Sequence, residues 1–230
     1  WKHLKTLLSV LHPMLRRQEL AYQIFVVEQH GNYTFNKGIL MNTGFLLAMN
    51  ASSFDCVVFH DVDLIPEDDR NLYHCASKKP RHLSVAIDSL DYRLPYNSLV
   101  GGVFAIRVED FVQVNGYSNL FWGWGGEDDD ISSRLMASHL QISRPNPSQA
   151  RYKMLGHGRR SVNKYLTSLI KTSRIRFPKD GLTTCKFRLV EEKFEPLFTH
   201  YVVDVGLPSY VVHNKTLKLS EEIPLPQKYL

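Results

Sequence analysis

The sequence contains no apolar run as long as a membrane-spanning helix requires, and it shows no signal peptide. It also lacks internal repeats, low-complexity segments and a domain linker. These absences exclude repeat architectures and extended, disordered chains. Its 230 residues are 43% hydrophobic and 22% charged, so we expect a single globular domain with a sizeable core.

Cysteine is also scarce, and Cys56, Cys75 and Cys185 have no metal-binding spacing. Two interpretations of Cys56 and Cys75 are open. In a reducing compartment they are unrelated core thiols, whereas in an oxidising one they close a loop of about 20 residues and add about 3 kcal/mol of stability. Cys185 has no evident partner, so we predict a buried thiol.

The net charge is +5, with a local excess of basic residues between positions 159 and 176. Nucleic acid is one partner for such a balance, but zinc-finger spacing and an aromatic RNP pattern are both absent. We therefore expect no nucleic acid partner, and note that a diphosphate ligand needs only local positive charge. Asn-x-Ser/Thr triplets at Asn32, Asn50 and Asn214 are candidate N-glycosylation sites and hint at the secretory pathway.

Hydrophobic periodicity predicts alternating helices and strands. Residues 1–20 read as an amphipathic helix with a kink or stop at Pro13, and residues 36–50 read as a second helix. Residues 21–28 and 55–60 read as buried strands, so the alternation indicates an α/β domain with a largely parallel sheet. Further expected elements are a strand at 84–87, an apolar strand within 99–106, a helix starting at the acidic residues 127–130, and two core strands between 180 and 206.

The most informative stretch is 121–130, Phe-Trp-Gly-Trp-Gly-Gly-Glu-Asp-Asp-Asp. Glycines permit tight turns, and an indole offers a flat apolar face with one donor, which suits a sugar ring. Four adjacent carboxylates repel one another, although the positive end of a helix dipole would favour them. We infer that both explanations hold: the helix start positions the acids, and at least one of them does chemistry.

A second acidic motif, Asp61-Val62-Asp63, follows the predicted strand at 55–60. Residues two apart lie on the same side of an extended chain, and open α/β sheets bind ligands at the carboxyl ends of their strands. A divalent cation with oxygen preference suits such a pair. The alternative is two solvated aspartates at the exit of a strand.

The segment Trp122–Asp130 resembles the signature of the animal β1,4-galactosyltransferase family, which are inverting nucleotide-sugar enzymes of the GT-A fold. The similarity runs from residue 4 to about residue 208. It implies a single GT-A-type catalytic domain over residues 1–230 with a mostly parallel central sheet and an irregular tail at 207–230. We expect the family's opening strand, with the segment that holds uracil and ribose, to be missing because it would precede Trp1.

The resemblance assigns roles to individual residues. It implies that Asp63, Met154 and His157 hold Mn²⁺ and that Asp128 is the general base. It implies a disulfide between Cys56 and Cys75 and a mobile lid at 158–180. Acceptor-binding residues would be Trp124, Glu127, Asp128 and Asp129, and nucleotide-sugar-binding residues would be Phe35, Lys37, Asp61, Val62, Leu99, Gly102 and Trp124.

Several positions depart from the family pattern, among them Ser89 and Leu90, which stand where Lys-Phe is commoner. Lys37 stands where Arg is usual, which keeps the charge but loses a planar fork for phosphate. Leu99 stands where galactose-using members carry Tyr, and the smaller side chain leaves room for an N-acetyl group on the donor. The Gly101-Gly102 pair after it fits either a tight turn or a close approach to a ligand.

We therefore expect transfer of N-acetylgalactosamine from its UDP donor to the 4-hydroxyl of a terminal β-linked N-acetylglucosamine. The alternative donor is UDP-galactose, and a non-catalytic carbohydrate-binding fragment is an alternative of another class. The family places such domains in the Golgi lumen, so contact with a membrane would occur only through an anchor outside this chain.

Overall fold

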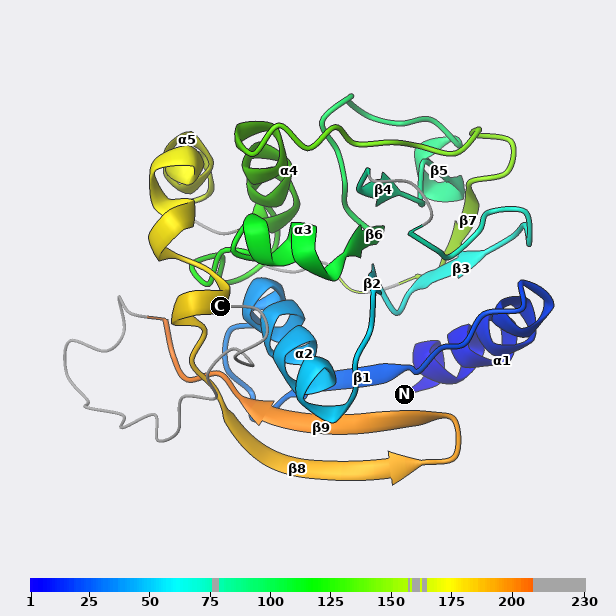
Figure 1. The fold of residues 1–230 in the computed structure, drawn as a ribbon, viewed down its shortest axis with the longest axis horizontal. Helices are drawn as coiled ribbons and strands as arrows, with labels where there is room; N and C mark the ends of the chain where they lie inside the picture. The colour runs from blue at the N-terminus through cyan, green and yellow to red at the C-terminus, as the bar shows by residue number, and fades with distance from the viewer. Residues whose placement is uncertain (76–78, 157, 159–161, 163–164, 209–230) are drawn as a thin grey trace. The chain divides into compact units, whose positions relative to one another are not determined.

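The computed structural model describes residues 1–75, 79–156, 158, 162 and 165–208 (Figure 1). Contacts divide the chain into two compact units, each assembled from separate stretches of sequence. Unit 1 comprises Trp1–Tyr22, Asp55–Asp110 and Leu135–Arg159, and unit 2 comprises Gln23–Phe54, Phe111–Arg134 and Arg160–Leu230. The expectation of a single catalytic domain over residues 1–230 stays a prediction.

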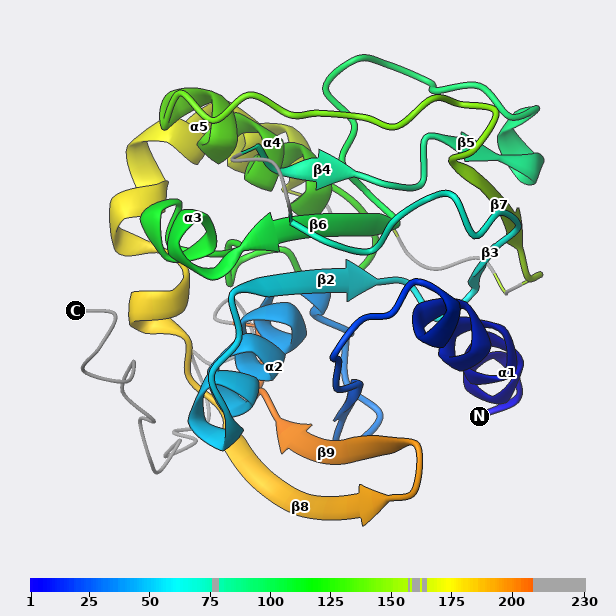
Figure 2. The ribbon, with the colours of Figure 1, turned by 45° about the vertical axis from the view of Figure 1, so that its right-hand side comes forward.

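Unit 1 contains two three-stranded sheets. Strand β6 lies between β2 and β4, and β7 lies between β3 and β5 (Figure 2). Its elements are α1 (Lys2–Arg17), β2 (Cys56–His60), β3 (Leu64–Pro66), β4 (Arg81–His82), β5 (Ala86–Ile87), the 3-10 helix η1 (Asp88–Leu90), β6 (Val103–Arg107) and β7 (Arg151–Met154).

Helix α1 forms where the apolar period predicted it, but Pro13 does not end it. The helix continues to Arg17 because its last turn is packed: Met14 and Leu15 are buried together with Leu11. Burial of this apolar face offsets the hydrogen bond that a proline removes from a helix.

Unit 2 contains the third sheet, in which β9 lies between β1 and β8, with α2 packed against β1 (Figure 1). Its elements are β1 (Phe25–Gln29), α2 (Lys37–Ala51), α5 (Leu166–Arg176), the 3-10 helices η2 (Phe177–Lys179) and η3 (Leu182–Thr184), β8 (Arg188–Glu195) and β9 (Phe198–Asp204). Two of the boundaries between the units fall within helices, α3 (Val108–Gln113) and α4 (Glu127–Ala137).

The expectation of a mostly parallel sheet is wrong for the described strands. Only β1–β9 and β5–β7 pair in parallel, whereas β2–β6, β3–β7, β4–β6 and β8–β9 are antiparallel. Parallel neighbours need a crossover of a dozen or more residues, usually a helix. Two residues join β8 to β9, and between β2 and β6 the described residues form no helix longer than η1.

Strand β8 corrects a second expectation. Both strands near the C-terminus were expected in the core, yet every residue of β8 is exposed while β9 buries His200, Tyr201 and Val203. The reason is its position at the edge of the sheet and its composition, since charged residues dominate the run. Charged side chains on an edge strand prevent pairing with another chain.

The other predicted elements agree with the structure within a few residues. The strand expected at 21–28 begins at Phe25, and the strand expected at 84–87 is shorter. Strand β4 and helix α3 were not predicted, and residues 209–230 of the expected tail lie outside the described residues. Among the helices that the structure describes, none has the length and apolarity to cross a bilayer.

Candidate active site

The predicted site residues form two groups, one in each unit. In unit 2 the glycine-rich stretch ends at Gly126, directly before the first residue of α4. Gly123, Gly125 and Gly126 have φ angles of +89°, +96° and +93°, a region that residues with a Cβ rarely adopt. The turn therefore requires glycine at these positions, and it delivers Glu127 to the N-terminus of α4.

Lys37 lies beside the acidic residues at the start of α4. Its Nζ is 3.3 Å from Oε1 of Glu127 and 3.7 Å from Oδ1 of Asp128. Glu127 is buried, whereas Asp128 and Asp129 are partly exposed. The ammonium thus offsets the repulsion between adjacent carboxylates while leaving the second and third acids accessible.

The start of α2 explains why Lys37 reaches this place. Asn36 caps the helix: its side-chain oxygen accepts a hydrogen bond from the Ile39 amide at 2.9 Å, and its side-chain amide donates to the Asn119 carbonyl at 2.9 Å. The Gly123 amide donates to the Phe35 carbonyl at 2.8 Å. Phe35 and Lys37, predicted to bind the nucleotide sugar, are therefore fixed against the glycine-rich turn.

The fourth acid of the run, Asp130, belongs to a buried ionic cluster. Asp130 is fully buried and accepts hydrogen bonds from Arg134 at 2.6 Å and Arg176 at 2.8 Å. Both arginines also pair with Asp180. This ionic cluster joins α4 to α5 and to the turn after η2, so Asp130 is unavailable to a substrate in this arrangement.

The two tryptophans differ in exposure. Trp122 is 8% exposed and belongs to the core, whereas Trp124 is 57% exposed and forms an isolated bridge with Val162. An exposed indole next to accessible carboxylates suits the apolar face of a sugar. Trp124 is thus the indole that fits the predicted role.

In unit 1 the strands bring Asp63 and Met154 together. Strands β3 and β7 pair antiparallel with Leu64 opposite Met154, and the Leu155 amide donates to the Asp63 carbonyl at 2.7 Å. Helix η1 lies beside them: the Asp88 carboxylate accepts from the Met154 amide at 2.8 Å, and the Ser89 hydroxyl donates to the Met154 sulfur at 3.2 Å.

The first aspartate of this motif lies beside the glycine pair. The Asp61 amide donates to the Gly102 carbonyl at 2.9 Å, and Val62 between the two aspartates is exposed. Gly102 has a φ of +87°, and a Cβ there would lie 2.6 Å from both Leu64 Cδ1 and Ser84 Oγ. A tight turn alone therefore explains why position 102 requires glycine, without a close approach to a ligand.

Leu99 lies in the same unit, on a loop that Arg144 holds. The guanidinium donates to the carbonyls of Asn97 and Leu99 at 2.8 and 2.9 Å. The loop backbone around the predicted donor-selecting residue is thus anchored by a side chain from a distant part of the sequence.

His157 lies outside the described residues, so its predicted part in the metal site stays a prediction. Among the residues that the structure describes, no three His, Cys, Asp or Glu side chains gather as a metal site. The carboxylate of Asp63 nevertheless suits Mn²⁺, and its neighbour Met154 offers a thioether, a soft and less usual ligand. The donors that are described therefore fit a partial manganese site.

The cysteine predictions are confirmed. Cys56 and Cys75 form a disulfide, and Cys185 is a buried free thiol 3.7 Å from the Thr43 hydroxyl. Burial raises the pKa of Cys185 to about 12, so the thiol stays protonated and unreactive.

Of the candidate glycosylation sites, Asn32 and Asn50 are exposed and Asn214 lies outside the described residues.

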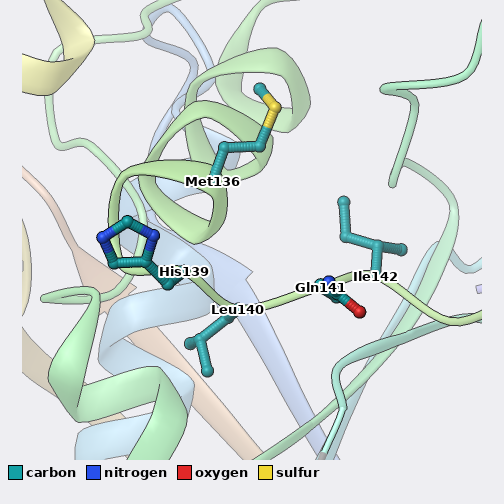
Figure 3. A pocket seen from close by; sticks show the side chains of 5 residues that line it. All are labelled: Met136, His139, Leu140, Gln141 and Ile142. Carbon is teal, nitrogen blue, oxygen red and sulfur yellow. The ribbon is translucent and has the colours of Figure 1, made fainter.

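A pocket of about 310 Å³ lies in unit 1 at the end of α4, and Figure 3 shows the five side chains that line it. It contains one histidine and no carboxylate, so it lacks the paired acids of the candidate site. Its lining residues are Met136, His139, Leu140, Gln141 and Ile142.

Comparison with known proteins agrees with this geometry. A family model described as the N-terminal region of glycosyl transferase group 7 matches residues 1–76. A second, described as the N-terminal domain of galactosyltransferase, matches residues 81–158. β-1,4-galactosyltransferase 2 of Cricetulus griseus is 45% identical over 210 residues, which cover 90% of this chain and 57% of that protein. The chain belongs to the animal β1,4-galactosyltransferase family.

Other members are similarly close. β-1,4-galactosyltransferase 4 of Cricetulus griseus is 45% identical over 207 residues, covering 88% of this chain and 60% of that protein. The chain thus spans less than two thirds of the curated relatives it matches. The catalytic domain of Drosophila β1,4-galactosyltransferase 7, solved with xylobiose, is 28% identical with a TM-score of 0.76 over 89% of both chains. The fold is accordingly of the GT-A type.

Proposed function

We propose that this chain carries the catalytic region of a metal-dependent, inverting glycosyltransferase. It moves a hexose from a UDP-sugar to the 4-hydroxyl of a terminal β-linked N-acetylglucosamine. The observation that carries the proposal is the start of α4, where Asp128 is accessible beside Trp124 on a turn that only glycines can form. Family membership adds the reaction class.

The residues of unit 2 take the acceptor. Trp124 stacks on the sugar, Glu127 and Asp129 accept hydrogen bonds from acceptor hydroxyls, and Asp128 removes the proton from the attacking 4-hydroxyl. Such general-base catalysis contributes about 10²–10⁴ in rate. Lys37 holds Glu127 and Asp128 from one side, at 3.3 and 3.7 Å, and so orients both carboxylates before the acceptor arrives.

The residues of unit 1 hold the metal and part of the donor. Asp63, Met154 and His157 would bind Mn²⁺, which supplies charge neutralisation for the departing diphosphate. A mutant of the same Drosophila enzyme has been solved with manganese, UDP-Gal and xylobiose; it is 26% identical with a TM-score of 0.73. That complex supports manganese as the metal. The other proposed donor-binding residues of unit 1 are Asp61, Val62, Leu99 and Gly102, and those of unit 2 are Phe35, Lys37 and Trp124.

The relatives favour UDP-galactose as the donor, because the similar proteins named above are all galactosyltransferases. One residue favours the donor that we expected first. Leu99 is smaller than the tyrosine of galactose-using members and would admit the N-acetyl group of UDP-N-acetylgalactosamine. UDP-N-acetylgalactosamine is therefore the second candidate donor.

The covalent structure supports a compartment for the protein. The Cys56–Cys75 disulfide persists in an oxidising environment, which supports the lumen of the secretory pathway. Together with the family, it supports the Golgi lumen and GlcNAc-terminated glycoconjugates as acceptors.

A transfer assay with Mn²⁺ and a β-linked N-acetylglucosamine acceptor tests the proposal, with both UDP donors side by side. It is run on this chain and on an N-terminally longer form. We expect Asp128→Asn to abolish transfer and Asp63→Ala to abolish it together with the response to Mn²⁺. Asp69→Asn, an exposed carboxylate paired with Arg17, is the matched control and keeps activity.

Each outcome is decisive for one part. Preference for UDP-galactose that Leu99→Tyr leaves unchanged would reject the N-acetylgalactosamine donor, whereas a shift towards galactose in that variant would support it. Full activity of Asp128→Asn would reject the assigned base. Acceptor binding without transfer in both forms would favour a non-catalytic carbohydrate-binding protein.

A further inference from the structure

A line of hydrogen-bonded polar side chains in unit 1 ends on the backbone carbonyl of Asp61, the first aspartate of the Asp61-Val62-Asp63 motif. Nδ1 of His60 is 2.8 Å from the Asp61 carbonyl oxygen, and Nε2 is 2.9 Å from the Tyr73 hydroxyl. That hydroxyl is 2.8 Å from the Tyr152 hydroxyl, which is 3.1 Å from Nδ2 of Asn71. Tyr73, Tyr152 and Asn71 are buried, and His60 is partly buried.

The aspartate end of this line determines the direction of its hydrogen bonds. A carbonyl can only accept, so His60 carries its proton on Nδ1 and donates to Asp61. Desolvation lowers the pKa of His60, which keeps the ring neutral and leaves Nε2 as an acceptor. The Tyr73 hydroxyl therefore donates to His60, and its oxygen accepts from the Tyr152 hydroxyl.

The asparagine end requires the same direction. Nδ2 of Asn71 also lies 3.1 Å from the Leu83 carbonyl oxygen, which identifies this atom as the amide nitrogen. It donates to the Tyr152 oxygen, whose proton is then directed at Tyr73. Both ends thus fix a single orientation of the hydrogen bonds.

This line joins the two segments that carry metal ligands. His60 is the last residue of β2 and precedes Asp61-Val62-Asp63, while Tyr152 lies in β7 two residues before Met154. Tyr73 connects them from a segment that the Cys56–Cys75 disulfide ties back to β2. A broken link would leave a buried hydroxyl without a partner, a costly state that favours a shift of one segment against the other.

We propose that His60, Tyr73 and Tyr152 are positioning residues for the manganese site: their hydrogen-bonded line sets the placement of Asp63 relative to Met154. This inference rests on the proposed metal-dependent function. Groups that orient metal ligands without touching the ion typically change metal affinity by about 10- to 100-fold when removed.

The test is a Mn²⁺ titration in which electron paramagnetic resonance measures the free ion. Thermal unfolding is measured in parallel. Tyr73→Phe removes two links of the line and should weaken Mn²⁺ binding about 10-fold. Tyr152→Phe removes the donor to Tyr73 but keeps the bond from Tyr73 to His60, so its loss of affinity should be smaller. Tyr201→Phe removes a buried hydroxyl from β9 in unit 2 and should leave Mn²⁺ affinity unchanged.

The outcomes separate this inference from the proposed function. If the unmodified protein does not bind Mn²⁺, the metal-dependent function itself is rejected. If it binds and both unit 1 variants bind equally well with lowered unfolding temperatures, the hydroxyls are only structural and the positioning role is rejected. If Tyr73→Phe does not fold, Tyr152→Phe alone decides, because its affinity must still fall below that of Tyr201→Phe.

Discussion

Arg134 donates a hydrogen bond of 2.6 Å from Nε to Oδ2 of Asp130, and neither side chain is exposed to solvent. The pair sits one helical turn into α4, directly after the three acids that face Lys37 or solvent. A buried ion pair adds little stability compared with apolar packing, but removing one partner leaves the other charge buried and uncompensated. The last acid of the run therefore holds the helix in place, while the second and third acids remain accessible.

Asp130→Asn should lower the free energy of unfolding by about 3–5 kcal/mol, because Arg134 and Arg176 each lose their fully buried countercharge and keep only their pairs with Asp180. Chemical denaturation measures the effect. The matched control is Asp69→Asn, which breaks an ion pair on the surface and should change stability little. Equal destabilisation by the two substitutions would show that burial of the pair does not matter.

This cluster also shows what could be predicted from sequence. Asp130 and Arg134 are four residues apart, a spacing that brings side chains together on one helix, so that contact was open to prediction. Arg176 and Asp180 reach the same place only through tertiary packing. The Asp61-Val62-Asp63 motif is similar: the period of the chain predicted β2, but only the register of β3 with β7 brings Asp63 beside Met154.

The two wrong expectations, a mostly parallel sheet and a buried β8, have a common physical origin. The local sequence pattern shows which side chains are apolar, but it does not show which strands pair with one another. A core strand was expected in this region, yet β8 is an exposed edge because, among the strands that the structure describes, only β9 pairs with it. The line from His60 to Tyr152 escaped prediction for the same reason, since its members are distant in sequence and polar.

His82 should make stability depend on pH. The ring is fully buried, with Nε2 donating to the Gly101 carbonyl at 2.9 Å, and burial, aided by the charge of Arg144, lowers its pKa to about 4. Between pH 4 and 6.5 the unfolded chain binds a proton here that the folded protein does not. Stability should therefore fall as pH drops through this range, by about 3 kcal/mol from this group.

Denaturation at pH 5 and pH 7.5 checks this sign. His82→Gln should flatten the dependence, although His60, whose pKa burial also lowers, keeps part of the slope. His139→Asn is the control, because this histidine is exposed and asparagine tolerates its φ of +57°. A slope that His82→Gln leaves unchanged would contradict the assignment.

The disulfide should contribute measurably to stability. Cys56 and Cys75 are 19 positions apart, and closing a loop of that size is worth about 3 kcal/mol. We expect the double variant Cys56→Ser, Cys75→Ser to unfold at correspondingly lower denaturant concentration, and the unmodified protein to match it in the presence of a reductant. Cys185→Ala removes a thiol without a bridge, so reductant should still destabilise that variant. Insensitivity of the unmodified protein to reductant would argue against the bridge.

Gly125 and Gly126 offer a test of how the acidic helix start is built. Both have positive φ angles, so alanine strains the backbone at either position by about 1–2 kcal/mol. At Gly125 the added Cβ meets nothing within 4 Å. At Gly126 it would lie 2.1 Å from Leu166 Cδ1 and 2.6 Å from Cε1 of the buried Phe121 ring.

Gly126→Ala should therefore destabilise the protein by about 1–3 kcal/mol more than Gly125→Ala, since a packed ring has to move. Because Glu127 and Asp128 follow directly, transferase activity should also fall further in Gly126→Ala. Unfolding curves and transfer rates measured on the two variants give the comparison. Equal stability of the two variants would contradict the predicted cost of moving the Phe121 ring. If activity still differed between them, the turn would affect only the placement of the acids.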